Sequence, residues 1–234
     1  MDHLHNELKK EFQLERMILF SDAVFAIAIT LLVIEIKVPE IHEEITDEAI
    51  LQGLAHLIPK FVGFVISFLL IGLNWTIHHR MFGYVTAYNR RLLWLNLFFL
   101  FFIVLMPFST GLYGEFAGPA LVLHQLKVPM TFYVLNFCGA GIMNYWLWTY
   151  ISNPKHKLTD PPIPVLILKQ AKARALIVPI VFFLMLPTAY LIDVRVAVYV
   201  PLLMPIAMKI AAKRISKKYS TAVPKPVESQ VATD

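Results

Sequence analysis

Charged residues are scarce in this sequence of 234 residues: 16% are Asp, Glu, Lys or Arg, whereas 58% are hydrophobic. Soluble domains carry about 25% charged residues, so this composition excludes an ordinary soluble domain, and the apolar content excludes disorder. The single cysteine, Cys138, excludes a disulfide scaffold. It lies in an apolar run, where we interpret it as a small buried side chain rather than a reactive thiol. The sequence also lacks a glycine-rich nucleotide-binding loop. The class that remains is an integral membrane protein.

Long apolar segments make up most of the chain. A helix that crosses a bilayer needs about 20 mainly apolar residues, and six segments approach or exceed that length. We therefore predict an all-α integral membrane protein with six transmembrane helices, at residues 17–36, 61–77, 92–114, 128–154, 175–192 and 196–212. The predicted organisation is a cytoplasmic N-terminal segment at 1–15, a six-helix membrane domain at 16–218 and a disordered cytoplasmic tail at 219–234.

The distribution of positive charge predicts the orientation of these spans. With the N-terminus inside, 17 of the 21 lysines and arginines fall on the inner side, and the outer side keeps only Lys37, Lys60, Lys127 and Arg195. Loops rich in Lys and Arg stay in the cytoplasm, so we expect both termini to be cytoplasmic. The net charge of +5 then favours contact with anionic lipid, and we expect no nucleic-acid partner.

The first outer loop is acidic, and it allows two interpretations. It is either an ordinary solvated loop or a surface that concentrates cations. The acidic residues concerned are Glu40, Glu43, Glu44, Asp47 and Glu48.

Polar residues inside membrane spans gather at one depth, near the inner ends of the first three spans. They include Ser21 and Asp22, His78 and His79, and Asn96. Such residues are costly in a bilayer and mark functional or structural sites. A metal or catalytic site at the histidines is one interpretation, but adjacent helical residues point about 100° apart. We therefore favour a structural network between helices, with no metal ion and no cofactor.

The first span carries an aliphatic stripe. At 100° per residue, Leu31 and Ile34 fall within about 40° of Ile27, and Thr30 falls within about 60° of it. Asp22 lies about 140° from Ile27, so it points toward neighbouring helices while the stripe points elsewhere. Periodicity alone leaves the function of this stripe open, because most aliphatic stripes on membrane helices face lipid or pack in a core.

Three segments resemble those of a known family. Residues 16–22 have the form R-x-x-x-F-S-D, residues 75–82 the form W-x-x-H-x-R-x-F, and residues 95–108 contain Leu-Asn-Leu followed by Leu-Met-Pro-Phe. Together they resemble the transmembrane protein 175 family of potassium channels. That family lacks the T-V-G-Y-G filter of other potassium channels, as does this chain. A single six-span repeat resembles the prokaryotic members, which form homotetramers.

The resemblance implies roles for particular residues. It implies a pore lined by the first helix of each subunit, with a constriction at Ile27, Leu31 and Ile34 and with Thr30 also facing the pore. It implies a polar network between helices at the inner side, formed by Arg16, Phe20, Ser21, Asp22, Trp75, His78 and Asn96. Glu35 would attract cations at the outer mouth or pair with Lys37.

We therefore expect a cation channel that prefers potassium modestly over sodium, with the hydrophobic constriction as filter and gate. The expected partners are potassium ions, the lipid bilayer and further copies of the chain in a homotetramer. We expect no enzyme activity and a multi-pass location in a prokaryotic plasma membrane. One alternative is an ion- or proton-coupled secondary transporter, which normally needs internal repeats and polar residues at the midplane. A membrane-embedded enzyme using Asp22, His78 and His79 is a further alternative.

Overall fold

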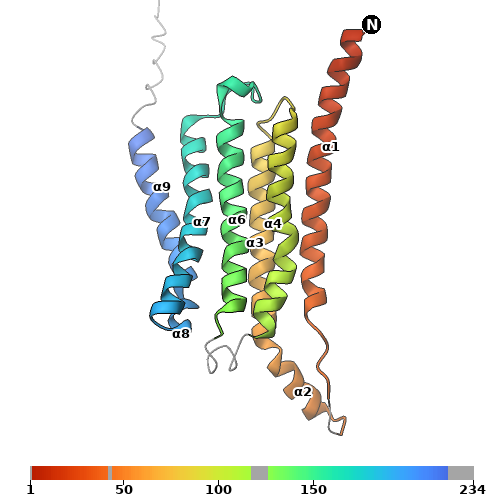
Figure 1. Ribbon diagram of the computed structural model, residues 1–234, viewed down its shortest axis with the longest axis vertical. Coiled ribbons are helices and arrows are strands. Elements are labelled where there is room, and N and C mark those ends of the chain that lie inside the picture. Colours follow the sequence, from red (N-terminus) through yellow and green to blue (C-terminus); the bar gives the residue numbers. More distant parts are fainter. Residues whose placement is uncertain (1, 42–43, 117–125, 221–234) are drawn as a thin grey trace, which may run out of the picture.

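The computed structural model describes residues 2–41, 44–116 and 126–220, and every regular element in these ranges is a helix. This confirms the all-α prediction. The elements are α1 (Asp2–Leu31), η1 (Leu32–Glu35), α2 (Asp47–His56), α3 (Ile58–Phe82), α4 (Arg90–Glu115), α6 (Val128–Ile151), η2 (Pro154–His156), α7 (Val165–Leu191), α8 (Val194–Ala197), η3 (Val200–Leu203) and α9 (Met204–Ser220). The long helices stand side by side in Figure 1, with α1 at one edge of the bundle and α9 at the other.

Local sequence signals set several helix boundaries. Asn89 begins α4, because its side-chain oxygen accepts a hydrogen bond from the Leu92 backbone N–H at 2.8 Å. Proline stands in the first turn of α3 and of α6, where a missing N–H costs nothing. Pro107 lies within α4, which remains continuous. Neighbouring helices can satisfy the carbonyl that such a proline leaves free in a membrane.

The core follows one face of α4. Leu92, Asn96, Phe99, Ile103 and Met106 recur every three or four residues and are fully buried. This spacing places them on one side of a helix. The face contacts α1, α3 and α6, and α6 in turn packs against α7. The opposite face of α4 exposes large aromatic side chains, namely Trp94, Phe98, Phe101 and Phe108.

Five helical segments among the described residues are long and apolar enough to cross a membrane. They are Glu11–Glu35, Ile58–Phe82, Arg90–Glu115, Val165–Leu191 and Val194–Tyr219. The sixth predicted span corresponds to α6, a 24-residue helix between α4 and α7 (Figure 1). Its Asn, Tyr and Trp side chains lower its hydropathy below that of the other five. The six-span count therefore stays a prediction.

The last two predicted spans differ most from the structure. The span expected to start at residue 175 begins at Val165, because Lys169, Lys172 and Arg174 lie in the first turns of α7 rather than in a loop. Long basic side chains can extend along a helix toward water, so they do not prevent helix formation there. The last span is interrupted by α8 and η3 and becomes a regular helix only from Met204.

The acidic outer loop also contains a helix that the sequence did not predict. α2 begins at Asp47, and the Thr46 hydroxyl accepts the Ala49 N–H at 3.1 Å. Asp47 and Glu48 stand in its first turn, where negative charge stabilises the helix dipole. Glu43 lies outside the described residues.

The start of α1 and the end of α9 lie at the same end of the bundle (Figure 1). The cytoplasmic assignment of that end remains a prediction from charge. α1 runs without a break across the predicted boundary at residues 15 and 16. In the predicted tail, Tyr219 and Ser220 belong to α9, and residues 221–234 lie outside the described residues.

Candidate functional site

The two faces of α1 and of η1, which continues it, differ sharply in burial. Met17, Ser21, Phe25, Ala28 and Leu32 form a buried face. The aliphatic stripe lies on another face: Ile27 is 57% exposed, Leu31 38% and Ile34 67%. α1 contacts α3 and α4 through its buried face, so the stripe points away from the bundle of its own chain.

Thr30 lies beside this stripe and is exposed. Its hydroxyl donates back to its own helix, at 2.9 Å from the Ile27 carbonyl oxygen and 3.1 Å from that of Ala26. The oxygen lone pairs of Thr30 therefore remain available on the exposed face.

A chain of buried hydrogen bonds joins α1, α4 and α3. The Asn96 amide nitrogen donates to Ser21 Oγ at 2.8 Å, and Asn96 Oδ1 lies 2.8 Å from His78 Nε2. Ser21 Oγ donates in turn to the Met17 carbonyl oxygen at 2.8 Å. Because Asn96 Oδ1 is an acceptor, His78 carries its proton on Nε2. One asparagine thus links three helices.

A second hydrogen bond joins α1 to α3 at the same level. The indole nitrogen of Trp75 donates to Asp22 Oδ1 at 2.9 Å. The ring of His79 lies beside Trp75, with 5.6 Å between the ring centroids. Asp22 therefore points toward α3, as its angle on the helix predicts.

Two residues expected in this network lie elsewhere. The guanidinium of Arg16 lies 5.7 Å from the centre of the Phe12 ring on the same helix. Phe20 is 53% exposed. Within the described part of the chain, neither forms a hydrogen bond or an ion pair with α3 or α4, so the single chain brings together Ser21, Asp22, Trp75, His78 and Asn96 only.

Three aromatic rings enclose His78, and sequence reasoning missed them. The ring centroids of Phe25, Phe82 and Phe99 lie 5.5, 4.2 and 5.8 Å from that of His78. Each phenylalanine follows a network residue by one helical turn, because Phe25 follows Ser21, Phe82 follows His78 and Phe99 follows Asn96. The sequence could have predicted that these phenylalanines lie beside the network, since residues three or four apart share a helix face.

A further polar group, nearer the start of α3, was also missed. Thr110 donates to Ser67 Oγ at 2.8 Å, and Ser67 Oγ lies 3.5 Å from the Tyr133 hydroxyl. All three side chains are buried. They tie α3, α4 and α6 together at the end of the bundle opposite to the start of α1.

Glu35 ends η1 and lies against α4. A methyl group placed on Gly111 would come within 2.7 Å of the Glu35 carboxyl carbon, so the Glu35 side chain would have to move to admit it. Within the described ranges, no ion pair joins Glu35 to Lys37. The neighbouring acid, Glu115, is paired with Lys60 at 2.6 Å.

Among the residues that the structure describes, no three His, Cys, Asp or Glu side chains come close enough together to hold a metal ion. The groups brought together here can hold helices in register and can line a path, and they include no nucleophile–base pair.

Comparison with known proteins places this arrangement in context. The family described as endosomal/lysosomal potassium channel TMEM175 matches residues 16–107. A potassium channel of Streptomyces collinus is 34% identical over 148 residues, covering 62% of this chain and 66% of that protein. A potassium channel of Chamaesiphon minutus is 34% identical over 154 residues, covering 66% of this chain and 73% of that protein.

The fold has a solved counterpart as well. The crystal structure of a lysosomal potassium-selective channel TMEM175 homolog from Chamaesiphon minutus aligns with a TM-score of 0.66 and 26% identity. The alignment covers 88% of this chain and 99% of that one. The family match at residues 16–107 contains the stripe of α1 and all five residues of the polar network.

Proposed function

Since this chain belongs to the TMEM175 family of potassium channels, we propose that it forms a potassium-permeable channel whose pore is lined by α1. The chain is a multi-pass membrane protein. In our proposal it acts in the plasma membrane of a prokaryote as a homotetramer, because one chain supplies only one wall of a pore. Transport through such a pore needs no catalytic group.

The observation that carries this proposal is the exposed stripe on α1. Ile27 and Leu31 on α1 and Ile34 on η1 are exposed, and none of the described elements covers them. α1 itself stands at the edge of the bundle (Figure 1). The exposed face of α4 differs in composition, because large aromatic side chains such as Trp94 and Phe98 predominate there beside Val104. Aromatic side chains suit contact with lipid and its interface. The narrow aliphatic stripe beside Thr30 suits a pore wall shared by several copies.

Selectivity would follow from the cost of removing water. A ring of Ile27 side chains offers a passing cation no oxygen in exchange for its hydration shell. Potassium holds water less tightly than sodium, so it crosses such a ring at lower cost, and the preference is modest. An aliphatic ring can also expel water and so close the path. Thr30 is the nearest oxygen on this face to a partly dehydrated ion.

The polar network would hold this wall in place. Ser21 and Asp22 stand on α1 within two turns of Ile27, and they bond Asn96 and Trp75 on two different helices. These contacts limit both the rotation and the sliding of α1 against the bundle. Glu35, held beside Gly111, would place a negative charge at the outer mouth and attract cations.

The experiment is a pair of matched substitutions in purified protein reconstituted into planar bilayers. The reversal potential is measured with potassium on one side and sodium on the other. Ile27→Asn is compared with Val104→Asn on α4, because the two side chains are 57% and 51% exposed in the single chain. We expect Ile27→Asn to raise conductance or to bring the potassium-to-sodium permeability ratio toward one, and Val104→Asn to leave both unchanged.

Equal behaviour of the two variants would contradict a pore at Ile27, because it would mean that both residues face lipid. A wild-type protein that is folded but carries no current in repeated reconstitutions would contradict the channel itself. The coupled-transporter alternative would then be tested by uptake driven by an imposed proton gradient.

A further inference from the structure

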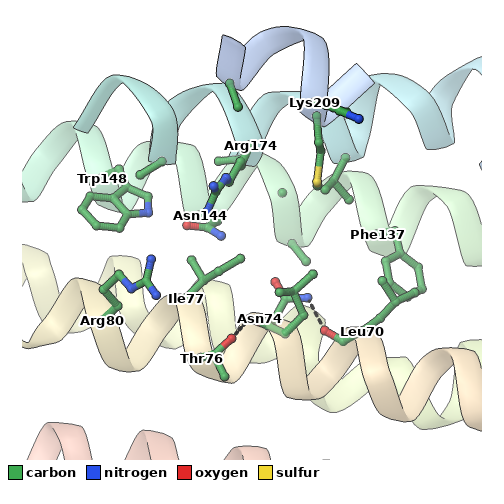
Figure 2. A pocket seen from close by; sticks show the side chains of 18 residues that line it. Leu70, Asn74, Thr76, Ile77, Arg80, Phe137, Asn144, Trp148, Arg174 and Lys209 are labelled. Carbon is green, nitrogen blue, oxygen red and sulfur yellow. Dashed lines mark hydrogen bonds between the residues drawn. The ribbon is translucent and has the colours of Figure 1, made fainter. Parts of the chain in front are cut away.

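A cavity lies between α3, α6, α7 and α9, in the half of the bundle that holds the start of α1. Its volume is about 370 Å³, which is in the range of small-molecule sites. Figure 2 shows its walls, which include none of the described side chains of α1. The cavity is therefore separate from the proposed pore, and nothing in the proposed function uses it.

Two buried polar atoms at this cavity have no hydrogen-bond partner among the described residues. They are the indole nitrogen of Trp148, which is 1% exposed, and Oδ1 of Asn144, which is 3% exposed. Figure 2 shows the Trp148 nitrogen and the Asn144 amide beside one another at the same wall. A buried polar atom without a partner is costly, and more so in a membrane. One of these atoms is a donor and the other an acceptor, so a ligand that reaches them by a small shift of the two side chains satisfies both if it offers an acceptor and a donor.

Positive charge surrounds the same space. Arg80 on α3, Arg174 on α7 and Lys209 on α9 line the cavity, and none of the acidic residues that the structure describes does. None of the three has an ion pair within the described part of the chain. In Figure 2, Arg80 and Arg174 extend from opposite walls toward the space beside Asn144 and Trp148. The ligand is therefore an anion at this end of the cavity.

Most of the rest of the wall is apolar and runs along the helix axes, with Asn74 and Thr76 as its other polar residues. Leu70, Leu73, Ile77, Phe137, Val178 and Met208 contribute to it. The α3 part alone runs from Leu70 to Arg80, ten residues or about 15 Å of helix. A free inorganic anion would leave this apolar length unused, whereas an acyl chain would fill it.

We propose that this cavity binds an anionic glycerophospholipid whose headgroup carries a hydroxyl, with phosphatidylglycerol as the model ligand. The phosphate accepts hydrogen bonds from Arg80, Arg174 and the Trp148 indole. A headgroup hydroxyl donates to Asn144 Oδ1, and Lys209 adds positive charge at the α9 wall. An acyl chain lies along the apolar walls of α3 and α6. The bound lipid thereby joins α3 to α7 and α9, three helices that frame the cavity.

The test measures lipid binding to the purified full-length chain in detergent by native mass spectrometry and by the shift in melting temperature. The probes are phosphatidylglycerol, phosphatidylcholine, phosphatidic acid and inorganic phosphate. We expect phosphatidylglycerol to bind most tightly and to raise the melting temperature, and inorganic phosphate to leave it unchanged. Equal binding of phosphatidylcholine and phosphatidylglycerol would overturn the proposal, and so would an equal effect of inorganic phosphate.

Variants locate the site. Arg80→Gln and Arg174→Gln should each weaken phosphatidylglycerol binding about tenfold, the loss expected for a charge-assisted hydrogen bond. Lys172→Gln is the matched control, because it removes the same charge from α7 at a residue that does not line the cavity. It should change binding less than twofold. An equal loss in Lys172→Gln would overturn the site, since charge alone would then attract the lipid.

Asn144→Leu tests the hydroxyl contact separately. Removal of the unpartnered acceptor should leave the lipid-free protein as stable as the wild type or more stable. The variant should lose the preference for phosphatidylglycerol over phosphatidic acid, which has no headgroup hydroxyl. A preserved preference in this variant would contradict the Asn144 contact.

Discussion

Replacement of Asn96 by leucine tests the energetic role of the polar network. Leucine fills a similar volume, but it removes the 2.8 Å bonds to both Ser21 Oγ and His78 Nε2. Each buried hydrogen bond contributes about 1 kcal/mol in soluble proteins and about 0.6 kcal/mol in measured membrane cases. His78 would also keep a buried N–H without a partner, at a cost of about 1 kcal/mol or more. We expect Asn96→Leu to lower the free energy of unfolding by about 2–3 kcal/mol.

The assay is reversible unfolding in mixed micelles with sodium dodecyl sulfate, followed by circular dichroism, for a double-mutant cycle. Ser21→Ala alone should cost about 2 kcal/mol, because it removes one of the same bonds and leaves a buried Asn96 N–H without a partner. The double variant should cost less than the sum of the two by a similar amount. Ser152→Ala, which removes an exposed hydroxyl, is the control and should change stability by less than about 0.5 kcal/mol. Additive costs in the cycle, or a fully stable Asn96→Leu, would refute the reasoning.

Two more predictions use the same unfolding assay. In Gly141→Ala the new methyl carbon would lie 2.6 Å from Pro179 Cδ and 3.2 Å from the Ala175 carbonyl oxygen, so α7 must move away from α6. We expect a loss of about 1–3 kcal/mol, against no loss in Gly63→Ala, where nothing lies within 4 Å; equal effects would exclude close packing at Gly141. Trp75→Phe removes the donor to Asp22 and should cost about 1 kcal/mol, whereas Asp22→Asn keeps the acceptor and should cost less. The reverse order would show that the charge of Asp22, and not the bond, matters.

Periodicity and charge predicted the features of this fold that depend on one helix at a time. The angle between Asp22 and Ile27 on a helix follows from 100° per residue, and the structure shows Asp22 turned toward α3 while Ile27 is exposed. Polar residues at one depth in three spans predicted that Ser21 and Asn96 lie close together. The role of Ile27 in a pore stays a proposal, because it depends on contacts between copies of the chain.

Features that depend on packing between helices could not be predicted from the sequence. The start of α7 at Val165 was missed because the basic residues in its first turns were assigned to a loop on the basis of their charge. The cavity was missed for a different reason. Trp148 and Arg174 are 26 positions apart on different helices, and only the packing of α6 against α7 places them at one space.

The position of α6 also bears on how the protein enters the membrane during synthesis. A helix inserts by itself when its transfer from water to lipid is favourable, and asparagine and tyrosine side chains reduce that gain. α6 carries Asn136 and Asn144, which are buried against α4 and α7 in the finished bundle. When α6 leaves the ribosome, α4 has already been made but α7 has not. One of the two helices that pack against α6 is therefore synthesised later. The insertion of α6 is then coupled to that of α7, and a substitution that impairs α7 should also impair the membrane insertion of α6.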